Sequence, residues 1–139
     1  MTLSPSKQIF IGVMGAPYES ELITSLMRMV DESLAQGHRV IVWTCGGATT
    51  LTQSALGEVK PRNLLDLGTD RESVEYPSTA ALVKGLIKTA QGRLQWYVCR
   101  HCMEERGAEG QIPDVKVMPP YKFVEYHSRA EISLVMGVK

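Results

Sequence analysis

Two cysteines separated by two residues mark the segment of this chain where chemistry is expected first. An apolar run, Leu94 to Val98, leads into Cys99, Arg100, His101 and Cys102. A thiol at the C-terminal end of a strand, just before a helix, meets unpaired backbone N–H groups and the positive end of the helix dipole. Both favour thiolate over thiol, and Arg100 and His101 act in the same direction. The sequence therefore predicts that Cys99 is a reactive thiolate.

The spacing of Cys99 and Cys102 is compatible with several chemistries. In a redox pair the first cysteine attacks and the second resolves, although Arg-His between the two is atypical of that pattern. A structural zinc site needs four ligands, and only Cys45, His101 and a distant histidine could complete one, so no metal is predicted. A persulfide carrier needs one accessible cysteine in a positive environment, and Cys99 satisfies that. The structural alternative is an inert cysteine that ends a buried strand.

Alternating apolar runs and amphipathic stretches indicate the elements that position these cysteines. Strands are predicted at Gln8–Met14, His38–Thr44, Gln95–Cys99, Val115–Met118 and Ile132–Met136, and helices at Ser20–Gln36, Ser78–Gln91, Met103–Ala108 and Tyr121–Ala130. Between residues 48 and 76 a short helix at Thr49–Leu56 and an irregular or helical connection at Lys60–Gly68 are expected. This alternation predicts one α/β domain over residues 1–139, with a mostly parallel five-stranded sheet in a three-layer α/β/α, flavodoxin-like arrangement.

The loops at the carboxyl edge of that sheet carry the remaining candidate site residues. They are Gly15 and Tyr18 after the first strand, Cys45, Gly46 and Gly47 after the second, and the Cys99 to Cys102 turn after the third. If the strand order were 2-1-3-4-5, the second and third strands would flank the first, about 9 to 10 Å apart at their ends. A Cys45 to Cys99 bond would then need loop movement. Gly46 and Gly47 could cradle an anion or simply form a turn, and Tyr18 could close over the cysteine loop or pack on a helix end.

The composition narrows the classes of partner and cofactor. Fifteen Lys and Arg balance fifteen Asp and Glu in 139 residues, so neither nucleic acid nor an anionic membrane is an expected partner. No apolar run approaches the roughly 20 residues of a membrane span, and three cysteines are too few for a disulfide scaffold. A cytoplasmic protein with reduced thiols is expected. No GxGxxG motif or hydroxyl-rich phosphate loop follows the first strand, so no flavin, nicotinamide or other cofactor is predicted.

One resemblance extends over nearly the whole chain. Tyr97-Val98-Cys99, followed after five residues by Glu105-Arg106-Gly107, resembles the DsrE/TusD sulfur-carrier pattern, and the turn from Gly15 to Tyr18 is similar to that family's first loop. The resemblance implies a flavodoxin-like fold, a trimer or hexamer, and transfer of sulfane sulfur as a persulfide on Cys99. The implied partners are sulfur-donor and sulfur-acceptor proteins, TusA-like or rhodanese-like, or small sulfur species. Cys102 has no counterpart in the single-cysteine pattern, and the Cys45-Gly46-Gly47 loop departs from it.

Three functional hypotheses follow. The first is a sulfur carrier in which Cys99 accepts sulfane sulfur and Cys102 releases it or stabilises the loaded state. The second is a thiol-disulfide oxidoreductase or redox sensor that uses Cys99 and Cys102 as a pair. The third is an oligomeric binding module whose cysteines are incidental. Assembly into a homo-oligomer is expected because Trp43, Trp96 and Tyr97 on short strands need cover.

Overall fold

The computed structural model describes residues 5–15, 21–54 and 78–137 as a five-stranded sheet covered by helices. The strands are β1 (Gln8–Met14), β2 (Arg39–Thr44), β3 (Leu94–Cys99), β4 (Lys116–Met118) and β5 (Ile132–Gly137). The helices are α1 (Leu22–Ala35), α2 (Thr79–Ala90), α3 (Arg100–Glu105) and α4 (Tyr121–Arg129), with a 3-10 helix, η2, at Gly46–Thr52. Tyr18 and the Lys60–Gly68 connection lie outside the described residues. The predicted strands and main helices are therefore confirmed within a few residues of their expected ends.

The sheet is parallel throughout, and its strand order is β4-β3-β2-β1-β5. The predicted α/β class and five parallel strands are confirmed, but the 2-1-3-4-5 order is wrong. β1, β2, β3 and β4 follow one another across the sheet, and the chain then returns to place β5 beside β1. The site depends on this difference, because β2 and β3 are direct neighbours.

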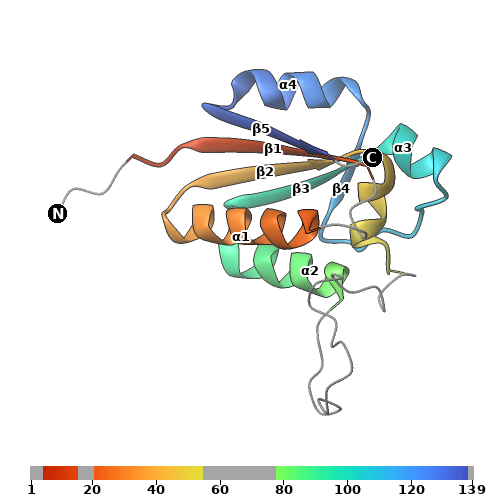
Figure 1. Cartoon of the computed structure of the whole chain (residues 1–139), viewed down its shortest axis with the longest axis horizontal. Helices are drawn as coiled ribbons and strands as arrows, with labels where there is room; N and C mark the ends of the chain where they lie inside the picture. The colour runs from red at the N-terminus through yellow and green to blue at the C-terminus, as the bar shows by residue number, and fades with distance from the viewer. Residues whose placement is uncertain (1–4, 16–20, 55–77, 138–139) are drawn as a thin grey trace, which may run out of the picture.

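The helices form two outer layers, as Figure 1 shows. α1 and α2 lie together on one face of the sheet, and α4 lies on the other. Successive right-handed crossovers in one direction put their helices on one face, and a crossover that runs back puts its helix on the opposite face. The α4 connection reverses direction between β4 and β5, so it covers the second face. α3 and η2 lie near one another at the carboxyl edge of the sheet.

Both faces of the sheet are sealed by apolar side chains. On the α1 and α2 face, α1 contributes the apolar residues that recur every three or four positions, Ile23, Leu26, Val30 and Leu34. On the α4 face, Phe10, Trp43 and Tyr97 form a second cluster. Trp43, Trp96 and Tyr97 are all buried within one chain. The expectation that a neighbouring subunit must cover these aromatics is therefore wrong.

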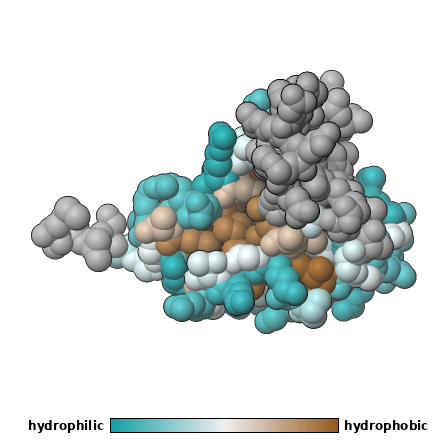
Figure 2. Space-filling view, turned by 90° about the horizontal axis from the view of Figure 1, so that it is seen from below, coloured by the Kyte–Doolittle hydropathy of each residue, from teal (hydrophilic) through white to brown (hydrophobic). Residues whose placement is uncertain are grey.

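The surface formed by α1 and α2 carries apolar residues in its middle, bordered by hydrophilic ones (Figure 2). A cleft of about 190 Å³ lies there, and Leu34, Leu86 and Ala90 are among its lining residues. None of its lining residues is a cysteine, so this cleft is separate from the predicted site. Among the described residues, no helix is long and apolar enough to cross a membrane.

Candidate functional site

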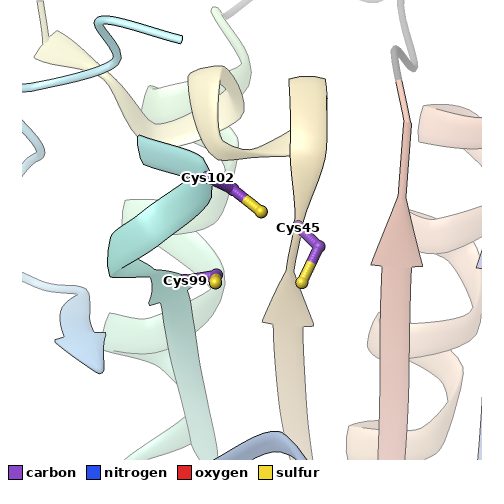
Figure 3. A group of neighbouring side chains, drawn as sticks. All are labelled: Cys45, Cys99 and Cys102. Atoms are coloured by element: carbon purple, nitrogen blue, oxygen red, sulfur yellow. The ribbon is translucent and has the colours of Figure 1, made fainter. Parts of the chain in front are cut away.

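Three cysteines converge at the carboxyl edge of the sheet, one directly after β2 and two at the junction of β3 and α3. The sulfur atoms of Cys45, Cys99 and Cys102 all lie within 4.8 Å of one another. Figure 3 shows Cys45 just beyond the end of β2, Cys99 at the end of β3, and Cys102 on α3, with Cys102 directed toward the β2 side. All three are free thiols. The prediction that one sheet edge gathers the thiols is confirmed, and the cluster is tighter than expected.

Direct pairing of β2 with β3 explains this closeness. Thr44 lies opposite Val98 in the register, so Cys45 and Cys99 follow at matching positions on adjacent strands. The buried Thr44 hydroxyl donates a hydrogen bond of 3.0 Å to the Tyr97 carbonyl and ties the two strand ends together. The expected separation of two strand spacings between Cys45 and Cys99 is wrong, because β1 does not stand between them.

α3 brings the third sulfur into the cluster. The helix begins at Arg100, directly after Cys99, rather than at Met103 as predicted. Cys102 therefore lies in its first turn, and its backbone N–H is close enough to Cys99 to bond the thiol. A cysteine three residues further along in an extended chain would instead be carried away from β3. Because α3 begins directly after Cys99, its first turn brings Cys102 back beside Cys99.

Cys45 is a protonated, well-positioned thiol. The indole Nε1–H of Trp43 donates to Cys45 Sγ at 3.0 Å. Burial raises the pKa of Cys45 to about 12, and proximity to Cys99 and Cys102 adds to the rise, while the Trp43 hydrogen bond opposes it. At neutral pH, Cys45 therefore carries its proton and is held in place by Trp43.

Cys99 is the most deeply buried of the three, with 3% of its surface exposed. Burial is the main cause that raises the pKa of Cys99. The Cys102 backbone N–H lowers that pKa, whereas a hydrogen bond with the Cys102 side chain raises it and one with Cys45 lowers it. The expected preference of Cys99 for the thiolate is wrong for the reduced protein, because desolvation outweighs the backbone N–H contribution.

The basic residues near the cluster are arranged differently from the prediction. Arg100 and His101 are both exposed on α3. A cation that sequence reasoning missed, Arg106, reaches back over the loop after β2: a Cβ placed on Gly46 would lie 3.8 Å from its Nη2. The Glu105-Arg106-Gly107 motif contained this residue, but nothing in the sequence showed which way its side chain turns.

The glycine loops after β1 and β2 touch each other beside the cysteines. Gly15 and Gly46 both have positive φ, 87° and 61°, and a Cβ on Gly46 would lie 3.2 Å from the Gly15 backbone nitrogen. Gly46 and Gly47 begin η2, and the Thr49 and Thr50 hydroxyls bond back to their carbonyls. The predicted site residues Gly15, Gly46 and Gly47 therefore lie around Cys45. Glycine is needed at position 46 because the backbone there has a left-handed conformation and lies close to the Gly15 backbone.

The wall behind the cysteines is apolar and aromatic. Cys45, Cys99 and Cys102 pack in one cluster with Trp43 and Tyr97 from the sheet, and with Met118, Phe123 and Tyr126. Tyr97 and Tyr126 stack with ring centroids 4.6 Å apart. Such a wall excludes water from one side of the thiols. Among the described residues, the cysteines are the group able to hold a metal ion.

Comparison with known proteins agrees with this architecture. The family model described as "DsrE/DsrF-like family" matches residues 7–132. The crystal structure of the ychN protein from E. coli superposes with a TM-score of 0.66 at 16% identity, covering 95% of this chain and 99% of that one. At that identity the likeness shows a shared fold. No curated protein matches the chain. Because the family match covers most of the chain, including all three cysteines, the chain belongs to the DsrE/DsrF-like family.

Proposed function

We propose that this protein is a sulfur carrier that holds sulfane sulfur in its three-cysteine cluster, with Cys99 as the residue that bears the persulfide. The observation that carries the proposal is the convergence of three free thiols within 4.8 Å. It is supported by membership of a family that generally acts in sulfur relay. We assign the carrier role to Cys99 because it ends β3 directly before α3, with Gly107 eight residues further on.

The burial of Cys99 gives Cys102 a part in loading. Cys102 is only partly buried, so a donor meets it before it meets Cys99. Cys102 takes the terminal sulfur from a donor persulfide, R–S–SH, and releases R–SH. Cys99 then attacks that outer sulfur, which forms the Cys99 persulfide and returns Cys102 to its thiol. Each step exchanges one S–S bond for another, so no external oxidant or reductant is required.

Unloading uses the same exchange in the opposite sense. An acceptor thiol attacks the outer sulfur of the Cys99 persulfide and leaves with it, and Cys99 regains its thiol. If Cys102 attacks the inner sulfur instead, hydrosulfide leaves and a Cys99 to Cys102 disulfide forms. The proposed donors and acceptors are proteins of the TusA-like or rhodanese-like kinds, or small sulfur species. A cytoplasmic location would supply the reduced thiols that this cycle needs.

The first test is sulfur loading of a matched set of cysteine variants. The reduced wild type, Cys99→Ser, Cys102→Ser and Cys45→Ser proteins are each exposed to polysulfide, thiosulfate or tetrathionate and weighed intact by mass spectrometry. We expect a reversible sulfur adduct on wild type that maps to Cys99, and none that persists in Cys99→Ser. Cys102→Ser should reach the same extent of loading more slowly, because the accessible thiol is missing.

The result that contradicts the proposal is stable loading of Cys99→Ser to the wild-type extent. Cys45→Ser serves as the control for loss of any one thiol from the cluster, and it should still load Cys99. Equal loss of loading in Cys99→Ser and Cys102→Ser would indicate a paired mechanism instead.

A second candidate function, a thiol-disulfide couple, is favoured by one contact. The Cys99 and Cys102 side chains interact in the reduced protein, and their sulfurs lie within 4.8 Å of each other, so a disulfide needs only a small movement. This candidate predicts that a Cys99 to Cys102 disulfide forms in a glutathione buffer of cytosolic potential without any sulfur donor. Peptide mapping after trapping with an alkylating reagent distinguishes that disulfide from a persulfide by mass.

A further inference from the structure

We infer that the Cys45, Cys99 and Cys102 cluster is a trigonal binding site for a soft, monovalent metal ion of the copper(I) type. The inference rests on the geometry of the cluster and does not depend on sulfur transfer. Three thiols with mutual sulfur distances within 4.8 Å, contributed by two strand ends and a helix, form a preassembled set of soft ligands. Thiolate ligands select soft ions such as Cu(I) over hard ones such as Mg²⁺.

The spacing suits one ion at the centre of the three sulfurs. Thiolate sulfur binds a first-row d¹⁰ ion at about 2.3 Å, and three such sulfurs in a plane around it lie about 4 Å apart. The three sulfurs already lie within 4.8 Å of one another, so small side-chain rotations are enough to bring them to that spacing. An ion entering the site takes up three sulfur ligands and displaces the thiol protons, with no change in oxidation state.

The number of ligands favours copper(I) over zinc. Structural zinc sites are almost always four-coordinate, and among the described residues no histidine or carboxylate joins the three sulfurs. Copper(I) accepts three ligands and has no need of a fourth. Cys45 adds a third thiol to the CxxC pair without completing the tetrahedron that zinc requires.

The surroundings offset the negative charge of a metal–thiolate centre. The Trp43 indole N–H donates to Cys45 Sγ, and the backbone N–H of Cys102 bonds Cys99. The Arg106 guanidinium lies over the loop beside Cys45. Donors of this kind orient metal ligands and stabilise their charge. Phe123 and Met118 belong to the apolar side of the same cluster, which limits access of water and oxidants to a copper(I) ion.

Anaerobic titration of the reduced full-length protein with copper(I), against a chromophoric copper(I) chelator, tests the site. We expect one ion per chain, and an X-ray absorption spectrum with three sulfur neighbours at about 2.3 Å. Cys45→Ser and Cys102→Ser should each weaken the affinity at least about tenfold. Cys102 lies on a partly exposed helix turn, so its variant remains informative if Cys45→Ser does not fold. Far-UV circular dichroism checks the fold of each variant.

Several outcomes would overturn the site. A two-sulfur spectrum in wild type, or unchanged affinity in Cys45→Ser, would mean that the CxxC pair alone binds the ion. Zinc is titrated in parallel and should bind at least tenfold more weakly, so equal or tighter zinc binding would overturn the copper(I) assignment. Sulfur loading is measured on metal-free protein. Failure of the metal site and failure of the carrier function are thereby read out separately.

Discussion

At the scale of single residues, desolvation and local electrostatics oppose each other at Cys99. The strand-to-helix turn supplies a backbone N–H that favours the thiolate, as the sequence suggested. Burial against aromatic side chains raises the pKa of the same thiol, and it is the largest contribution. Cys102 is more accessible than Cys99 even though it comes second in the motif. Cys99 therefore comes first in the motif, but Cys102 is the thiol that a reagent from solution meets first.

This difference predicts the order of alkylation. Iodoacetamide at pH 8 should modify Cys102 before Cys99 and Cys45, because Cys99 is buried and burial raises the pKa of Cys45 to about 12. Peptide mapping of a time course measures the order. Modification of Cys99 first would show that the turn activates it in spite of burial.

The raised pKa of Cys45 also predicts a pH dependence of stability. Its folded-state pKa of about 12 exceeds the ordinary 9.0, so the thiol favours the folded state below pH 9. That contribution is lost as the pH rises from 9 toward 12. The free energy of unfolding, measured in urea at pH 8 and pH 10.5, should fall less steeply in Cys45→Ala than in wild type. Parallel pH profiles of the two proteins would contradict the assignment.

At the scale of elements, the cluster depends on how three loops meet. η2 and α3 pack together, and the Gln111 side chain ties η2 to the loop after α3 by donating to the Thr49 and Ala108 carbonyls. The loop after β1 touches the loop after β2 through Gly15 and Gly46. The positions of the sulfurs are therefore set by contacts between loops as much as by the strands that carry them.

Two glycines form a matched pair for testing the loop contact. Gly37 and Gly46 both have positive φ, but a Cβ on Gly37 meets nothing within 4 Å, whereas on Gly46 it meets the Gly15 backbone. Gly37→Ala should cost about 1 to 2 kcal/mol for the left-handed backbone alone. Gly46→Ala should cost at least about 1 kcal/mol more because of the close contact. Urea unfolding measures both, and equal losses would show that the Gly15 contact is not tight.

At the scale of the whole molecule, the exposed apolar residues gather near one edge of the sheet. β5 is an edge strand, and Ile132, Leu134 and Val135 on it are exposed, as are Tyr121 and Val124 on the neighbouring α4. An unpaired apolar edge is a natural place for a second copy to join. We propose that the homo-oligomer expected from the sequence forms through β5 and α4, and not through the aromatics of β2 and β3.

Light scattering coupled to size exclusion tests that assembly. Val135 is 57% exposed, so Val135→Asp should not disturb the core, and it should convert the oligomer into monomer. Lys116→Asp, at an exposed position on the opposite edge strand β4, is the control and should leave the mass unchanged. A monomeric wild type, or a Val135→Asp protein that stays assembled, would contradict the proposed interface.

The residues of each segment are enough to predict the elements and the edge of the sheet at which the thiols gather. A continuous apolar run marks a strand buried on both faces, and apolar residues three or four apart mark a helix that buries one face, so β1 and α1 were predictable from their own residues. Parallel strands end at one edge, so Cys45 and Cys99 could be predicted to lie at the same edge of the sheet. The pairing of β2 with β3 could not be predicted in this way, because strand order depends on contacts between segments distant in the chain. That pairing brought Cys45 beside Cys99, and burial behind the aromatic wall decided the protonation of both.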